Sequence, residues 1–239
     1  MKNRSGKKVF LTASWENLIL VTYKVKPGLL LPYMPPGLEA DTIDGEAFIS
    51  LVAFDFLNTR VKGIKFPFHS DFPEINLRFY VKNREKRGVV FIREFVPKTV
   101  IPLIANNLYN ENYVCIPMKS SLEKNGKVLL SHSIKFGKKE YQINIEAENK
   151  PYLPGADSIE HFFKEHEWGF GTSRKKRLLS YKVEHQFWEI YPVKKFGHNF
   201  DFGELYGKEW EFLNSESPFN ITFAKGSEIK VYTTVISEF

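Results

Sequence analysis

The sequence predicts a mainly β domain of the α+β class. We expect antiparallel sheets curled into a barrel or a sandwich, with two or three short helices outside or plugging one end. Strand-like runs dominate the chain, hairpin turn signals recur between them, and helical periodicity is confined to short segments. Aromatic residues make up 15% of the 239 residues, and aromatic side chains favour pleated, half-buried surfaces.

Two apolar runs open the predicted elements. Val9–Leu11 and Leu18–Val25 predict strands, because both are rich in β-forming residues. Pro27-Gly28 breaks the second run. The short apolar segment Leu29–Met34 then predicts one helical turn, closed by Pro35-Pro36-Gly37.

A hairpin is predicted next, from Leu38–Ile43 to Glu46–Leu57. Asp44-Gly45 lies between these runs and suits a type I′ turn, which needs positive φ at both central residues. Arg60–Phe72 predicts a loop in which His69 is exposed.

The middle of the chain predicts two strands and a helix. In Ile75–Val81 apolar residues alternate with polar ones, which predicts a half-buried strand. Gly88–Val96 is apolar on both faces except at Arg93 and Glu94, which predicts a central strand. In Thr99–Glu111 apolar residues stand at i, i+3, i+4 and i+7, which predicts a helix.

The clearest hairpin joins Ser120–Glu123 to Lys127–Phe136 through Asn125-Gly126, a strong two-residue turn signal. The alternation in Lys139–Glu148 predicts a third strand. Recurring hairpins of this kind argue for antiparallel sheets.

Short helices and further strands complete the chain. Asp157, with Glu160 three residues later, predicts the start of a short helix that Gly169 ends. A second short helix is expected near Asp201. Further strands are predicted over Leu178–Tyr191, Ile221–Ala224 and Glu228–Ile236.

The composition is that of a globular domain. Hydrophobic residues make up 43% and charged residues 26%, which allows a sizeable core and excludes a disordered chain. We find no internal repeat or long linker, so residues 9–239 are expected to form a single domain after a flexible basic N-terminus over residues 1–8. No signal-peptide-like stretch is present, and no apolar run approaches the ~20 residues of a membrane helix. A cytoplasmic protein with no membrane partner is therefore expected.

The charge pattern and the single cysteine limit the functional classes further. The net charge is +6, but the densest basic cluster, Arg174–Arg177, lacks the interleaved aromatic residues of RNA-binding motifs. No nucleic-acid partner is therefore expected. Cys115 cannot form an internal disulfide, and its apolar neighbours predict a buried, inert thiol.

Several catalytic motifs are missing from the sequence. There is no Gly-rich phosphate loop and no Gly-x-Ser-x-Gly nucleophile elbow. The six histidines form no His-Glu-x-x-His pair, and His161 and His166 are five residues apart, which turns them away from a common helical face. No metal site and no cofactor are expected.

Three stretches resemble the YqjF-like family of uncharacterised bacterial proteins. They comprise Tyr23–Pro27 with Pro35–Asp41, Glu74–Val81 with Gly88–Lys98, and Leu108–Tyr113 with Glu165–Gly169. This family resembles a branch of the acetoacetate decarboxylase-like superfamily. The resemblance implies a cone-shaped antiparallel β-barrel with an internal pocket.

The local likeness to the decarboxylases is Arg93-Glu94 followed by Pro97-Lys98. It implies that Lys98 matches the lysine that forms a Schiff base with the substrate ketone, with Arg93 and Glu94 as catalytic candidates beside it. Such an amine must be uncharged, a state that burial and a neighbouring cation favour. The second lysine of the decarboxylases is replaced by Thr99, so acetoacetate itself is not expected to be the substrate.

A candidate ligand site follows from the predicted strand Ile75–Val81. Asn76, Arg78 and Tyr80 share its polar face, which in a barrel would line the lumen and suit an anionic or carbonyl ligand. A solvent-exposed face is the alternative. Trp168 is expected to contribute a lid to the same site.

Two functional classes stay open. One is an enzyme of the lyase type that acts on a small carbonyl or carboxylate compound through a Schiff base on Lys98. The other is a non-catalytic barrel that binds a small ligand. A buried Lys98 pointing into a cavity favours the first class, and an exposed Lys98 favours the second. Exposed edge strands also allow a homodimer.

Overall fold

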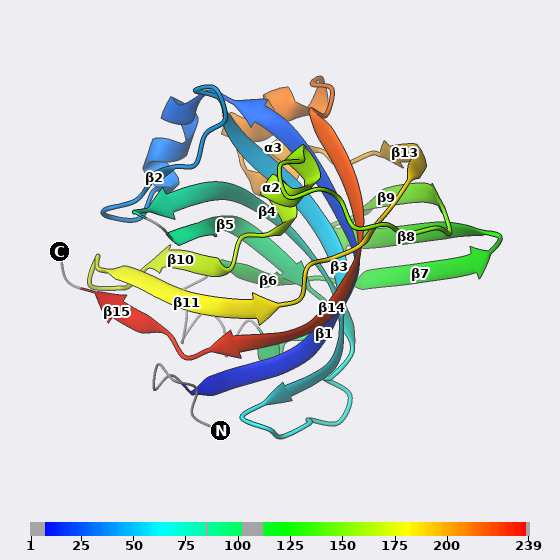
Figure 1. The fold of residues 1–239 in the computed structure, drawn as a ribbon, viewed down its shortest axis with the longest axis horizontal. Coiled ribbons are helices and arrows are strands. Elements are labelled where there is room, and N and C mark those ends of the chain that lie inside the picture. Colours follow the sequence, from blue (N-terminus) through cyan, green and yellow to red (C-terminus); the bar gives the residue numbers. More distant parts are fainter. Residues whose placement is uncertain (1–7, 85, 102–111, 238–239) are drawn as a thin grey trace.

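The computed structural model describes residues 8–84, 86–101 and 112–237. Over these residues the chain is mainly β, as predicted, and the strands form two sheets (Figure 1). The larger sheet contains β1 (Val9–Val25), β2 (Glu39–Ala40), β3 (Ala47–Val61), β4 (Phe72–Asn83), β5 (Lys86–Val96), β6 (Tyr113–Cys115), β10 (Trp168–Thr172), β11 (Leu178–His185), β12 (Ile190–Tyr191), β14 (Asn220–Tyr232) and β15 (Val235–Ser237). The smaller sheet contains β7 (Met118–Asn125), β8 (Lys127–Phe136), β9 (Lys139–Glu148) and β13 (Val193–His198). The helical segments include η1 (Pro27–Tyr33), α2 (Ile159–Lys164), α3 (Phe202–Tyr206) and η2 (Lys208–Asn214).

Strands of the larger sheet form a closed ring. In order around it they are β14, β1, β3, β4, β5, β10 and β11, and β11 pairs back with β14. The pairs in this ring are antiparallel except β5 and β10, which run parallel with Trp168 opposite Gly88. A Cβ atom at Gly88 would lie 2.3 Å from the Trp168 carbonyl oxygen, so this parallel contact requires glycine.

Strands β3, β4 and β5 are buried on both faces over most of their length. Successive side chains point to opposite sides of the sheet, so each strand contributes to two cores. In β1, Leu18 and Leu20 belong to a core inside the ring, whereas Ile19 and Val21 belong to a core shared with the smaller sheet, α3 and η2. The strand predicted over Ile75–Val81 lies within β4 and is likewise buried on both faces, because its polar side lines the ring interior.

The two ends of the ring differ. The short helix α2 packs at one end, where the Phe163 ring lies 5.1 Å from that of Phe48 at the start of β3. At the far end of β3, the loop between β3 and β4 lies beside the start of β1, and the Lys62 backbone N–H donates to the Phe10 carbonyl at 2.7 Å (Figure 1). A helix therefore packs at one end of the ring, and a loop borders the other.

The chain reverses at both predicted turns, but only the first has the predicted two-residue geometry. Asp44 and Gly45 have φ angles of 52° and 80°, as a type I′ turn requires. The second hairpin joins β7 to β8 as predicted, but it turns at Gly126, which has a φ of 71°, and Asn125 is paired with Lys127 instead of forming a two-residue loop with Gly126. The first hairpin pairs differently from the prediction, however, because β2 pairs with β4 and only a single bridge links Ile43 to Glu46.

Several local predictions are corrected by the structure. Cys115 is exposed and not buried, because alternation in the short edge strand β6 turns its neighbours Val114 and Ile116 toward the core instead. Ser158, and not Asp157, caps α2, since its hydroxyl accepts from the His161 N–H at 3.1 Å. Trp168 is the first residue of β10, which is one of the strands of the ring, so it does not lie on a lid loop.

Two predictions fall largely outside the described residues. One is the helix predicted over Thr99–Glu111: residues 100 and 101 are helical, and residues 102–111 are not described. The other is the predicted basic N-terminus, of which residues 1–7 are not described. Among the described helices, none has the length and apolar character needed to cross a membrane.

Candidate functional site

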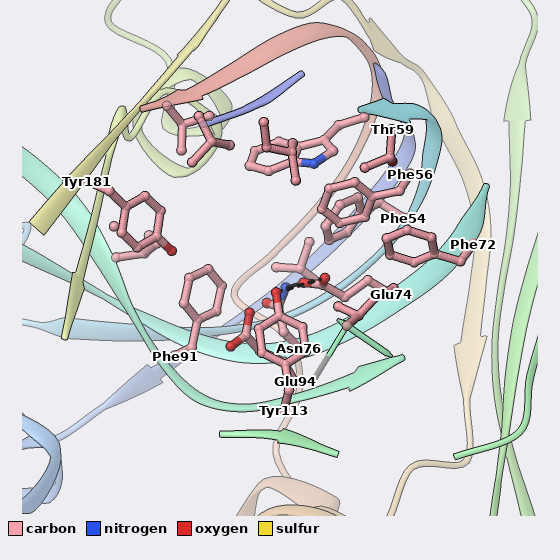
Figure 2. Close-up of a pocket in the computed structure, with 18 of the residues that line it drawn as sticks. Phe54, Phe56, Thr59, Phe72, Glu74, Asn76, Phe91, Glu94, Tyr113 and Tyr181 are labelled. Carbon is pink, nitrogen blue, oxygen red and sulfur yellow. Dashed lines mark hydrogen bonds between the residues drawn. The ribbon is translucent and has the colours of Figure 1, made fainter. Parts of the chain in front are cut away.

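A cavity of about 260 Å³ lies inside the ring of strands. Its walls are mainly aromatic and aliphatic, because every second side chain of the ring strands points inward. Figure 2 labels the aromatic lining residues Phe54, Phe56, Phe72, Phe91, Tyr113 and Tyr181. Such a lining excludes water from most of the wall and suits an apolar compound.

A group of polar side chains interrupts this apolar lining. Glu74, Asn76, Glu94 and Tyr113 gather on the wall formed by β4, β5 and β6 (Figure 2). The Asn76 side-chain amide donates to Glu74 Oε1 at 2.9 Å, and the Tyr113 hydroxyl donates to Glu74 Oε2 at 3.2 Å. Glu74 and Glu94 are both buried, so the cavity has two carboxyl groups on adjacent strands.

Arg78 introduces a positive charge further along β4. It follows Glu74 by four residues on the same face, which separates their backbones by about 13 Å along the strand. Its Nη2 donates to the Phe163 carbonyl oxygen of α2 over a long 3.4 Å. The cavity therefore has an acidic wall near Glu74 and a basic end near α2.

His166 lies at this basic end, directly after α2. Its ring packs 4.8 Å from that of Tyr80, and its Nε2 lies 3.3 Å from Asp41 Oδ2. Asp41 also accepts from Arg87 Nε at 2.6 Å. Burial alone would raise the pKa of Asp41, but the hydrogen bonds from His166 and Arg87 outweigh it and hold that pKa below its usual value.

The protonation state of His166 follows from these contacts. Burial lowers the pKa of His166 to about 4, although Asp41 opposes this effect, so the imidazole is neutral at neutral pH. Because the Asp41 carboxylate only accepts hydrogen bonds, the single ring proton sits on Nε2. His166 Nδ1 is then an acceptor at the cavity.

We expect the folded protein to lose stability between about pH 6.5 and pH 4 through His166. Its folded pKa lies below the unfolded value of 6.5, so in this window the unfolded chain binds the proton and the folded chain does not. The shift is equivalent to about 3 kcal/mol at the acidic end of the window. A histidine-selective NMR titration checks the cause: the signal lost in His166→Gln should not titrate above pH 5, and titration near pH 6.5 would contradict it.

Several buried polar atoms at the cavity have no hydrogen-bond partner among the described residues. They are Trp15 Nε1, Thr59 Oγ1, Asn76 Oδ1, Arg78 Nε and His166 Nδ1. Buried polar atoms are nearly always paired, and leaving one unpaired costs ~1–3 kcal/mol. Together they supply donors and acceptors for a ligand inside the ring.

The structure separates the residues that the sequence grouped as catalytic. Glu94 lines the cavity, but Arg93 points to the other face of β5 and donates to the Leu205 carbonyl of α3. Lys98 is half-buried beyond the end of β5 and is not among the residues that line the cavity.

Three of the four residues predicted to bind a ligand lie at the cavity. Asn76, Arg78 and Trp168 line the cavity. Tyr80 is buried on the same face of β4, but its hydroxyl bonds to Ser50 Oγ at 2.6 Å and its side chain does not line the cavity.

Sequence reasoning missed Glu74 and His166. Glu74 had a usable signal, because it precedes Asn76 by two residues and therefore lies on the same face of the strand. The sequence carries no such signal for His166, since its position at the cavity depends on the path of the chain after α2. Trp15 also lines the cavity, with a half-buried side chain.

The comparisons with known proteins agree on family and fold. The family of uncharacterized conserved proteins designated DUF2071 matches residues 12–228. The uncharacterized protein YqjF of Bacillus subtilis (strain 168) is 28% identical over 178 residues, which cover 73% of this chain and 72% of YqjF. The resemblance stated from the sequence is confirmed.

Several solved structures share the fold at low sequence identity. The acetoacetate decarboxylase of Legionella pneumophila subsp. pneumophila str. Philadelphia 1 has a TM-score of 0.64 and 11% identity, with 100% of this chain and 92% of that chain covered. An acetoacetate decarboxylase-like enzyme from Sphingomonas wittichii RW1 has a TM-score of 0.63 and 11% identity, with 97% and 95% covered. The enduracididine biosynthesis enzyme MppR, complexed with pyruvate, has a TM-score of 0.64 and 12% identity, with 98% and 94% covered.

Proposed function

The chain belongs to the DUF2071 family of uncharacterized conserved proteins, and from its cavity we propose that it binds a small, mainly apolar compound with a carboxylate or carbonyl group. The observation that carries this proposal is the set of buried polar atoms that face an otherwise aromatic cavity. An apolar pocket with a few convergent polar groups is the usual form of a small-molecule site.

The carboxylate or carbonyl end is assigned to the basic end of the cavity. Among the described lining residues, Arg78 alone carries a fixed positive charge. A guanidinium is a planar fork of donors that matches a carboxylate. Among the residues that the structure describes, only Nη2 of Arg78 has a hydrogen-bond partner, at 3.4 Å. The adjacent His166 Nδ1 would accept from a hydroxyl or an N–H group of the same compound.

An enzyme that acts on such a compound is the second candidate. It is favoured by the two buried carboxyl groups, Glu74 and Glu94, because paired carboxyl groups in an apolar cavity can transfer protons to and from a carbonyl substrate. The fold neighbours include a decarboxylase and a pyruvate-bound enzyme. The Schiff-base route through Lys98 stays a separate proposal, and it requires this lysine to reach a cavity that it does not line.

We expect Arg78→Met to weaken the binding of carboxylates about tenfold to 100-fold and to leave neutral analogues unchanged. The reason is the loss of a hydrogen bond to a charged group, worth about 1.5–3 kcal/mol. Titration calorimetry with small aromatic and aliphatic acids, and with their amides, measures both effects. Arg84→Met is the matched control, since Arg84 is exposed at the β4–β5 turn.

A trapping experiment with ketones distinguishes binding from lysine catalysis. After incubation with pyruvate, acetoacetate and other ketones, borohydride would trap a Schiff base as a mass increase on Lys98 that Lys98→Ala removes. Reversible binding without such an adduct supports the binding function. Equal affinity of wild type and Arg78→Met for every carboxylate would overturn the assignment of Arg78.

A further inference from the structure

The loop between β3 and β4, residues 62–71, exposes apolar side chains that the fold does not bury. Ile64, Phe66 and Phe68 are all exposed, and Phe68 is 88% exposed. Phe68 also has a φ of 65°, a conformation that is costly for a bulky residue. Neither packing within the protein nor the needs of a turn explain phenylalanine at this position.

Positive charges alternate with these apolar side chains. Lys62 and Lys65 are exposed in this loop, and Arg60 is exposed just before it, near the end of β3. Within the part of the chain that the structure describes, no carboxylate lies within 4.0 Å of any of them. Lys65 acts electrostatically on Asp71, whose carboxylate accepts from the Asn58 backbone N–H at 2.7 Å, and Lys65 Nζ donates to Asn58 Oδ1 at 3.1 Å.

The loop also borders the entrance of the cavity. Phe66 and His69 line the cavity, as does Val100, and Phe66 and Val100 are exposed to solvent. The cavity therefore borders the surface at this loop. The other end of the ring is occupied by α2, and Figure 1 shows the β3–β4 connection at the end of the ring where β1 begins.

We propose that residues 60–68 dock this protein on a membrane surface that contains anionic lipids. The three apolar side chains would enter the region of the acyl chains, while Arg60, Lys62 and Lys65 contact headgroup phosphates. In this arrangement the cavity entrance faces the bilayer, so an apolar compound can move between the two. The lack of a long apolar run in the sequence bears only on spanning helices, and this contact is peripheral.

The test is co-sedimentation of the full chain with vesicles of phosphatidylcholine, with and without phosphatidylglycerol. We expect binding to the anionic vesicles that weakens as salt is added. Lys62→Gln with Lys65→Gln should weaken it about 30-fold, because each cation near an anionic surface contributes about fivefold. Phe68→Ser should weaken it about tenfold through the loss of apolar burial.

Matched controls lie elsewhere on the surface. Phe187→Ser removes an exposed phenylalanine beside His161 of α2, and Lys175→Gln with Lys176→Gln removes two exposed lysines from the β10–β11 turn. Both controls should bind as the wild type does. The proposal is overturned if anionic vesicles do not bind the protein, or if controls and loop variants bind equally. Conversion of a dimer to a monomer by Phe68→Ser would assign the loop to a second copy instead and would also overturn it.

Discussion

Replacing Lys164 by methionine is expected to lower the free energy of unfolding by about 3–5 kcal/mol. The Lys164 side chain is 0% exposed and forms an ion pair with Glu165, which is 9% exposed. Removing the lysine leaves the Glu165 carboxylate buried without its cation, and an uncompensated buried charge is among the most costly defects in a protein.

The surroundings of Glu165 do not replace that cation. The Trp188 backbone N–H reaches Glu165 Oε1 only at 3.4 Å, and His185 Nδ1 lies 3.9 Å from Oε2. Burial lowers the pKa of His185, so its imidazole favours the neutral form. Lys164 therefore supplies the close cation for Glu165, whose longer contacts with Trp188 and His185 connect the end of α2 to the end of β11 and the segment that follows it.

Urea unfolding of Lys164→Met, Glu165→Gln and the double variant measures the coupling. The double variant should recover part of the loss, because it removes both charges together. The exposed pair Lys182 and Glu167, 3.0 Å apart and 34% and 48% exposed, is the control, and breaking it should cost less than ~1 kcal/mol. A loss below ~1 kcal/mol in Lys164→Met as well would show that the buried pair does not hold α2.

Local chemistry explains why much of the fold could be predicted. Alternation alone located β9 at its observed bounds, and Asp201 was correctly expected to begin a helix, since its carboxylate accepts from the Glu204 N–H at 3.0 Å. The strand-like runs themselves predicted the mainly β class, and the family resemblance narrowed it to an acetoacetate decarboxylase-like fold, which the structural neighbours confirm.

Contacts between distant segments explain what could not be predicted. The parallel pairing of β5 with β10 closes the ring, yet it joins residues about 80 positions apart and leaves no periodic signal. Nothing local marks Lys164 as buried, because its burial arises only when α2 packs on the ring. The same reason applies to His166, whose partner Asp41 lies 125 residues earlier.

The candidate site was predicted in part. Asn76 and Arg78 were placed on one polar face, and both line the cavity, because alternation along a strand is a local property. Lys98 came from a resemblance in sequence, which aligns positions but does not fix where a side chain points. Lys98 does not line the cavity, and the polar groups on its wall include those of Glu74, Asn76 and Glu94 (Figure 2).

Replacing Gly226 by alanine is expected to lower the free energy of unfolding by about 4 kcal/mol. Gly226 has a φ of 88°, and a Cβ atom there would lie 1.9 Å from the Trp15 carbonyl oxygen of β1. The contact is with backbone, so no side-chain rotation relieves it. Gly28→Ala is the control: it meets no atom within 4 Å and should change stability by less than ~0.5 kcal/mol.

The same substitution connects the stability of the ring to its cavity. Gly226 lies opposite Glu16 where β14 pairs with β1, and the neighbouring Trp15 contributes its side chain to the cavity lining. The ring must separate there to admit the methyl group, which moves Trp15 and the indole N–H that it offers to a ligand. Gly226→Ala should therefore weaken carboxylate binding in the calorimetric assay even where urea titration shows the protein folded. Wild-type affinity in the folded variant would mean that Trp15 contributes nothing to the ligand site.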